Sequence, residues 1–437
     1  MKGRSSVALG FLALIVVGAI LLSCPLSRNA GTWGGWADGI FTACSAVCVT
    51  GLTVVDVAAE YNFAGRIVLL TLVEIGCVGL MTLGTFLLLA IGRRLSLASE
   101  FSLMNAYGVP AVKGLRGLIV SVVVSMAVLQ GVGTAALYWR THDLFDAVFY
   151  SIMGFCNAGF SIYPGSLAHF ADDPYAMLTM TFLTVVGGIG FLVIYNLATF
   201  RFLRRRSGAR GRLSLHARVV LRFSFYLTAL MFALFLLAEW NGALAGFPVA
   251  KKLTAGLFQA VTPRTCGFCV VPTESLQPIT RLVYSFMMFM GGAPGSAAGG
   301  LKVTTLAVLV YTLFAMCRGE SETVIDRRAV SMEIVRESIV IGMSLVALVA
   351  VATGALFVTE ASRGIALDAL FFEAVSAITT TGLSVGDTTV RLSGGGRAVV
   401  MCAMFLGRLG ALTVVMMIGD RESKRHVRYP NEELVVG

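Results

Sequence analysis

The stretch ITTTGLSVGD (residues 378–387) decides the fold, because it places a hydroxyl-rich turn with one glycine directly behind the apolar run ALFFEAVSA (369–377). That run is too short to cross a bilayer, which takes about 20 helical residues. A half-length helix that ends inside the membrane leaves backbone carbonyls unpaired, and these are tolerated only where they line a water-filled path. The stretch therefore predicts a re-entrant helix followed by a turn at a pore.

The composition places this turn in a membrane protein. Of the 437 residues, 57% are hydrophobic and 13% charged, and the mean hydropathy is +0.83. These values exclude a soluble globular domain. Apolar runs long enough to span the bilayer predict eight transmembrane helices near 7–22, 67–91, 117–137, 176–200, 219–237, 282–314, 338–358 and 398–419.

Four copies of the glycine turn occur along the chain. They read DGIFTACSAVCVTGL, DAVFYSIMGFCNAGF, GLFQAVTPRTCGF and LFFEAVSAITTTGL, and their glycines are Gly51, Gly159, Gly267 and Gly382. Each glycine follows a phenylalanine by nine or ten residues: Phe41, Phe149, Phe258 and Phe372. The sequence predicts an all-α membrane protein of four M1–P–M2 repeats (span, pore helix, span) around one pseudo-four-fold pore, with repeats at 1–92, 93–204, 205–318 and 319–437.

Four such turns around one axis form a ring of backbone carbonyls, which can replace the hydration shell of an alkali cation. Glycine allows the sharp turn without a side chain in the lumen. The alternative is that these glycines mark ordinary helix packing. We expect this ring at the four turns that contain Gly51, Gly159, Gly267 and Gly382.

A second glycine signature follows each turn, as GCVG (76–79), GGIG (187–190), GGAPG (291–295) and GRLG (407–410). In the fourth copy, Arg408 replaces a small residue. An arginine inside an apolar span costs about 2.5–3.5 kcal/mol and usually faces a cavity or a partner. Two interpretations stay open: Arg408 points into the pore below the filter, or it pairs with Glu74.

The third copy is interrupted by GGAPGSAAGGLK (291–302), in which a proline and five glycines oppose a helix. We expect this gate loop to hang in the inner pore and obstruct it. A kinked, packed helix is the alternative, and a phosphate-binding loop is rejected because no strand precedes it. The predicted gate residues are Gly291, Gly292, Ala293, Pro294, Gly295, Ser296, Ala297, Ala298, Gly299, Gly300 and Lys302.

The pair CGFC suggests two interpretations. Cys266 and Cys269 match a redox C-x-x-C, which would make the chain a membrane thiol oxidoreductase. Cys266 also occupies the filter position of Thr50, Ala158 and Thr381, which favours a small lining residue sensitive to thiol reagents. The four histidines are isolated, so no metal site is predicted.

Basic residues concentrate in alternate connecting segments, which places both termini in the cytoplasm by the positive-inside rule. The excess positive charge is therefore topological, and no nucleic-acid partner is predicted. The run of arginines between Arg201 and Arg222 is either a simple anchor or a further dock for anionic membrane lipid or an acidic cytosolic protein.

The motifs VTPRTCGF (261–268), SAITTTGLS (376–384), GGAPGSAAGGLKVTT (291–305) and FLGRLGALT (405–413), together with the tail RYPNEELVVG, resemble the Trk/Ktr/HKT superfamily of potassium transporters. The short chain is most similar to the KtrB branch, the ion-translocating subunit. The resemblance implies a cell-membrane homodimer with one pore per protomer. It also implies a cytosolic ring of nucleotide-binding RCK subunits (KtrA-like) that acts through the gate loop.

Carried onto this chain, the resemblance makes Arg408 the family's pore-facing arginine. It also implies that the filter is the backbone of Val49, Thr50, Gly51, Leu52, Asn157, Ala158, Gly159, Phe160, Thr265, Cys266, Gly267, Phe268, Thr380, Thr381, Gly382 and Leu383. Members with serine at the first filter glycine tend toward sodium, so Gly51 favours potassium. In some members sodium promotes uptake. We therefore expect K+ as the permeant ion, no covalently bound cofactor and no enzymatic activity. A sodium-permeable or sodium-coupled version of the same pore remains the alternative.

Overall fold

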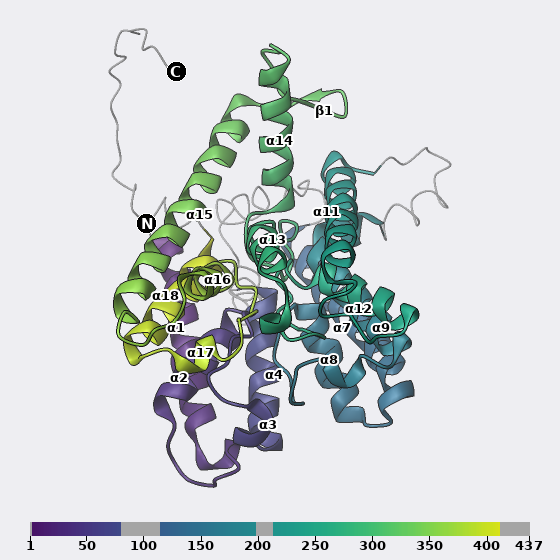
Figure 1. Cartoon of the computed structure of the whole chain (residues 1–437). Helices are drawn as coiled ribbons and strands as arrows, with labels where there is room; N and C mark the ends of the chain where they lie inside the picture. The colour runs from purple at the N-terminus through teal and green to yellow at the C-terminus, as the bar shows by residue number, and fades with distance from the viewer. Residues whose placement is uncertain (1, 80–113, 198–212, 411–437) are drawn as a thin grey trace.

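The structure, a computed structural model, describes residues 2–79, 114–197 and 213–410. It is predominantly helical (Figure 1). Within these ranges the strands form one hairpin, β1 (Val324–Ile325) with antiparallel β2 (Arg328–Ala329). The expected repeat boundaries at 92/93 and 204/205 lie outside the described residues.

Long apolar helices open the four expected repeats. They are α1 (Lys2–Ser23), α7 (Gly114–Thr141), α11 (Leu215–Glu239) and α15 (Met332–Thr359). In the described part of the chain, Val122–Thr141 of α7, α11 and α15 are long and apolar enough to cross a membrane. The pair Pro174–Ile189 and Phe191–Leu197, bent by 99°, is a fourth candidate. The count of eight spans stays a prediction, because the runs 67–91, 176–200 and 398–419 extend outside the described residues.

A short helix packs against each long one. These helices are α2 (Trp36–Val47), α8 (Leu144–Cys156), α12 (Val249–Val261) and α16 (Leu367–Ile378), each of 12 or 13 residues. The phenylalanines of the repeated motif anchor them, since all four are at most 2% exposed. This length matches the predicted half-spans, and each helix ends a few residues before its motif glycine.

A third set of helices follows the glycine turns: α4 (Phe63–Val78), α9 (Pro174–Ile189), α13 (Pro278–Phe289) and α18 (Gly394–Leu409). Three of them end at a glycine with positive φ, namely Gly79 (74°), Gly190 (88°) and Gly410 (85°). A residue with a side chain rarely adopts this backbone conformation, so the glycine signature breaks the helix there. In the third copy the segment 291–302 is not helical and lies between α13 and α14 (Val303–Cys317).

Small elements cap the two ends of the molecule. Figure 1 shows α3 (Val57–Glu60) and α17 (Thr388–Arg391) at the lower end, whereas the hairpin lies at the opposite end beside α14. Short 3-10 turns, η1 (Pro25–Ser27), η3 (Ala168–Phe170) and η4 (Thr273–Ser275), complete the connections.

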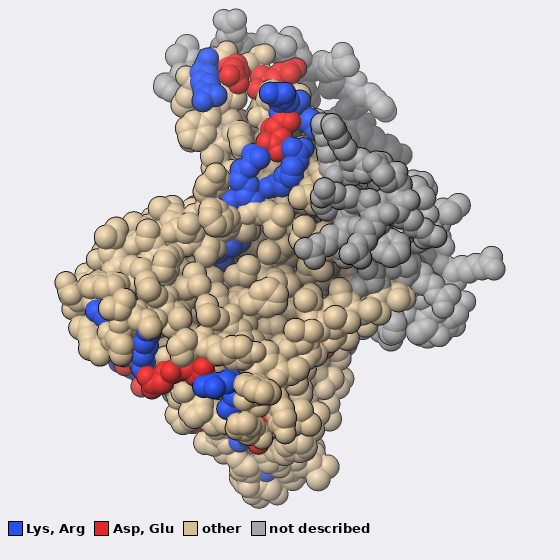
Figure 2. All heavy atoms as spheres, turned by 90° about the vertical axis from the view of Figure 1, so that its right-hand side faces the viewer, with Lys and Arg blue, Asp and Glu red and all other residues tan. Residues whose placement is uncertain are grey.

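The surface between these ends is apolar. Figure 2 shows a broad band without charged side chains, bounded by charged zones above and below. Leu237 on α11 and Val358 on α15 are 81% and 75% exposed. Large apolar side chains at this exposure suit a lipid environment, where they cost nothing in solvation.

Candidate functional site

The four motif glycines lie side by side in a closed ring. A Cβ built onto Gly51 would overlap the backbone of Gly159, and one built onto Gly159 would lie 2.7 Å from the carbonyl carbon of Gly267. A Cβ on Gly267 would be 3.2 Å from Cα of Gly382, and one on Gly382 would be 3.3 Å from Cα of Gly51. The structure therefore brings together four segments that are about a hundred residues apart in sequence.

The same unusual backbone turn recurs in all four copies. The residue two positions before each glycine has positive φ: Val49 (54°), Asn157 (54°), Thr265 (67°) and Thr380 (51°). Non-glycine residues seldom adopt this conformation, and when they do, it is often at functional sites. Its fourfold recurrence indicates one shared constraint at the ring.

Three of the four turns carry a threonine whose hydroxyl is buried. Within the described residues, the buried side-chain oxygens Oγ1 of Thr50, Thr265 and Thr380 make no hydrogen bond. An unpaired buried hydroxyl costs free energy, so such groups normally bond to water or a ligand. One of them, Thr380 Oγ1, lies against the gate loop, because a Cβ built onto Gly299 would overlap it.

Serines of the short helices hold the first and fourth turns in place. Ser45 Oγ accepts a hydrogen bond from Gly51 N at 3.0 Å, and Ser376 Oγ accepts one from Gly382 N at 3.1 Å. Both serines stand six positions before their glycine. This bonding fixes the glycine to its own helix, so the ring is a preformed feature of the scaffold.

The gate loop packs against the second and fourth copies. Ala293 N donates to Gly188 O at 2.9 Å, and Phe191 N donates to Gly295 O at 3.0 Å, both at the break after α9. A Cβ on Gly299 would overlap the carbonyl of Thr379, which lies three residues before Gly382. The loop thus sits directly against a segment that belongs to the ring.

Hydrogen bonds close the loop at its stem. Gly291 N donates to Leu301 O at 3.0 Å, and Leu301 N donates to Phe289 O at 2.9 Å. Lys302 Nζ donates to Ala298 O at 2.6 Å. The segment is therefore a compact loop, and the alternative of a continuous kinked helix is wrong.

Arg408 bonds to this loop. Its Nη1 donates to Ala297 O at 2.8 Å and its Nη2 to Gly76 O at 2.5 Å. The alternative partner, Glu74, instead accepts from Gln130 Nε2 at 3.1 Å. The expected alternative of an Arg408 and Glu74 ion pair is therefore wrong, because backbone carbonyls satisfy the guanidinium.

The CGFC cysteines are free thiols. Cys266 is fully buried, with Sγ 3.5 Å from Thr184 Oγ1, and Cys269 N donates to Ser166 Oγ at 3.1 Å. Reactive cysteines are usually partly exposed and lie in electropositive surroundings. The burial of Cys266 is that of a packing residue.

Several buried charged residues were not singled out by the sequence analysis, among them Glu373 and Arg264 near the ring. Glu373 on α16 is fully buried and accepts hydrogen bonds from the hydroxyls of Ser384 (2.8 Å) and Thr389. Arg264, three residues before Gly267, is 8% exposed. The signal for Arg264 was available, since the aligned copies have Cys48, Cys156 and Thr379 there. Glu373 gave less signal, because a single acid in an apolar run does not reveal its partners.

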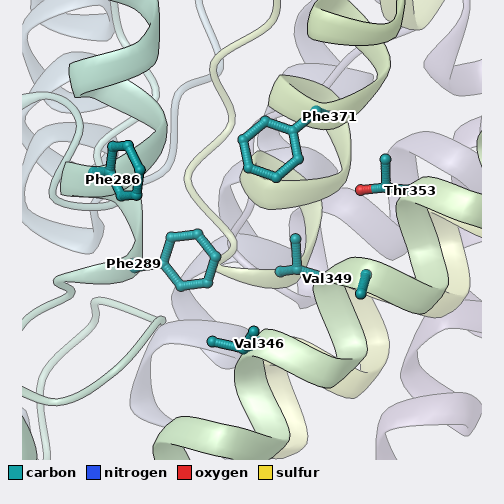
Figure 3. A pocket seen from close by; sticks show the side chains of 7 residues that line it. Phe286, Phe289, Val346, Val349, Thr353 and Phe371 are labelled. Atoms are coloured by element: carbon teal, nitrogen blue, oxygen red, sulfur yellow. The ribbon is translucent and has the colours of Figure 1, made fainter.

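An apolar pocket of about 460 Å³ lies between α13, α15 and α16 (Figure 3). Its only polar lining residue is a threonine, so it offers no coordination shell to a cation. The lining residues are Phe286, Phe289, Val346, Val349, Ala350, Thr353 and Phe371.

The helical fold and its apolar surface are those of a multi-pass membrane protein. The chain belongs to the TrkH family of cation transport proteins, whose family model matches residues 9–428. The TrkH potassium transporter of Vibrio parahaemolyticus shares the fold, with a TM-score of 0.71 and 17% identity over 94% of this chain and 84% of that one.

Relatives align over nearly the whole chain. It is 33% identical to the Ktr system potassium uptake protein B of Bacillus subtilis, over 98% of this chain and 96% of the relative. It is 30% identical to the potassium/sodium uptake protein NtpJ of Enterococcus hirae, over 99% of this chain and 96% of the relative.

Proposed function

We propose that this chain carries potassium into the cell through one pore whose filter is the backbone around Gly51, Gly159, Gly267 and Gly382. The closed ring of these glycines is the observation that carries the proposal. Two relatives that align over nearly the whole chain are named as a potassium uptake protein and a potassium/sodium uptake protein, which supports the choice of ion.

The transport step needs no covalent chemistry. Carbonyl oxygens such as those of Thr50 and Thr381, which lie against Gly382 and Gly267, replace water around the ion. The membrane potential, worth about 2.3 kcal/mol per charge per 100 mV, drives the cation inward. Each filter position must bind weakly enough to release the ion to the next.

The gate loop 291–302 closes the inner side of this path. Lys302, the last residue of the loop, bonds to the carbonyl of Ala298, and Arg408 on α18 bonds to that of Ala297. One cation thus stabilises the loop from within and the other holds it from a separate helix. Their positive charge also opposes the entry of a permeating cation at this level. Opening requires the loop to leave these contacts.

The functional unit we propose is a homodimer in the cell membrane, with both termini cytoplasmic and a cytosolic RCK ring (KtrA-like) on the inner face. The Bacillus subtilis relative carries the name of a Ktr system, which fits a multi-subunit assembly. The arginine-rich segment from Arg201 onward, which lies mostly outside the described residues, supplies charge for anionic lipid on that face.

Uptake of Rb+ by purified protein in liposomes tests the proposal. With an inward-directed potential, we expect Rb+ accumulation that excess K+ abolishes, and deletion of residues 293–299 should raise it. Empty liposomes are the control. The absence of any Rb+ uptake, with and without the deletion, would refute the potassium assignment.

A sodium-coupled version is the second candidate, favoured by the potassium/sodium name of the Enterococcus relative. The same liposomes distinguish it. Rb+ uptake that rises with added Na+ indicates coupling or activation, whereas strong uptake of Na+ alone indicates a sodium-permeable pore.

A further inference from the structure

Arg264 is a buried cation beside the ring, and the transport mechanism proposed above assigns it no role. It lies in the third turn, three residues before Gly267, and is 8% exposed. The aligned residues of the other copies are uncharged. Burying a guanidinium this deeply lowers the stability of the fold unless its N–H groups donate hydrogen bonds.

Its donors reach two different elements. Nη1 donates to Thr228 Oγ1 at 3.3 Å and Nη2 to Ser224 Oγ at 3.1 Å, both on α11. Nη2 also donates to Gly291 O at 3.4 Å. Within the described residues no carboxylate lies within ion-pair distance of it. The side chain therefore acts through directed bonds to neutral oxygens, and not through an ion pair.

Gly291 is the first residue of the gate loop and part of its stem. Its N donates to Leu301 O, which joins the beginning and end of the loop. A displacement of the third turn would therefore shift the Arg264 guanidinium relative to its acceptor at the stem, the carbonyl oxygen of Gly291. Arg264 is a side chain of the third turn that bonds to this stem.

We propose that Arg264 is a positioning residue that couples the third turn of the ring to the stem of the gate loop and holds the loop closed. This rests on the transport function proposed above. The planar fork of arginine serves α11 and the loop together, which the single ammonium of lysine cannot do in the same geometry.

A double-mutant cycle in liposomes tests the coupling. Arg264→Gln should raise Rb+ uptake several-fold in the intact chain and add nothing when residues 293–299 are deleted, while the Rb+/Na+ uptake ratio stays unchanged. Arg264→Lys should resemble Arg264→Gln. The control is Arg281→Gln, a partly buried arginine on α13 whose side chain makes no bond to the loop; its uptake should equal that of the wild type.

Three results would overturn the coupling: equal effects of Arg264→Gln with and without the loop, an altered Rb+/Na+ ratio without increased uptake, or full rescue by lysine. If Arg264→Gln does not fold, the variant Thr228→Val provides the test. It removes one acceptor of the Arg264 guanidinium and leaves the bonds to Ser224 and Gly291 in place.

For Thr228→Val we expect a smaller increase in Rb+ uptake, which vanishes when the loop is deleted. Uptake at the wild-type level would contradict the proposal. Failure of wild-type and loop-deleted protein to take up Rb+ would instead refute the transport function itself.

Discussion

Arg408 Nη1 lies 2.8 Å from the carbonyl oxygen of Ala297, so a cation on α18 is bonded to the backbone of a loop from the preceding repeat. The same guanidinium reaches Gly76 O on α4. One side chain thus joins the first, third and fourth copies of the unit. The bond to Ala297 thus connects Arg408, which departs from the repeat, with the gate loop, which departs from it most.

Replacing Arg408 with alanine should increase Rb+ uptake by the purified chain in liposomes. A charge-assisted hydrogen bond contributes about 1.5–3 kcal/mol, and about 1.4 kcal/mol corresponds to a tenfold change, so we expect an increase on the order of tenfold. Arg397→Ala on the same helix, which removes a partly exposed pair with Asp38, is the control. Uptake at the wild-type level would show that Arg408 does not hold the loop.

Gly159→Ala should abolish selective uptake. The added Cβ would lie 2.7 Å from the carbonyl carbon of Gly267, where no flexible side chain can move aside. Because Gly159 does not have a positive φ, the substitution tests the close approach alone. Gly354→Ala, which meets no atom within 4 Å, is the matched control. Rb+ and Na+ uptake measure the effect, and an unaltered ratio and rate for Gly159→Ala would argue against an ion path at the ring.

The double replacement of Cys266 and Cys269 with serine should leave Rb+ uptake within about twofold of the wild type. A hydroxyl can keep the contact between residue 266 and Thr184, which is a bond of moderate strength. A membrane thiol oxidoreductase would lose its activity in this variant. Loss of Rb+ uptake in well-folded protein would contradict this expectation and show that the thiols are needed for transport.

Acidification should weaken the hairpin contact at Asp326. The hydrogen bond from Arg222 lowers the pKa of Asp326, and the charges of Arg222 and Arg218 lower it further against the opposing effect of burial. A carboxyl whose folded pKa lies below its unfolded value, about 3.9, stabilises the fold above that value and loses this contribution as pH falls through the folded pKa.

Thermal unfolding of the detergent-solubilised protein measures this. Asp326→Asn should show a slightly lower Tm than the wild type at pH 7, since the pairs at 2.8 and 3.1 Å are partly exposed. The two proteins should converge as the pH falls below the unfolded value and through the lowered folded pKa of Asp326. A difference in Tm that does not shrink over this fall in pH would mean that the carboxylate charge is not the cause.

Much of the site could be predicted from the repeat. The spacing of Gly51, Gly159, Gly267 and Gly382, each behind a phenylalanine, predicted four short helices followed by turns, and the structure has them. The glycines and the proline of residues 291–302 predicted the loop. The partner of Arg408 could not be predicted, because its acceptors are backbone carbonyls, which every residue carries.

The sequence by itself determined the local elements of this protein: apolar length sets which helices can span the bilayer, and glycine marks where backbone must turn with positive φ. Only the tertiary structure decided which elements meet. Several contacts join residues that are distant in the chain: those that close the ring, the packing of the loop against Thr379, and the hydrogen bonds of Arg264 and Arg408. Their geometry depends on how helices pack in three dimensions, which a one-dimensional pattern does not contain.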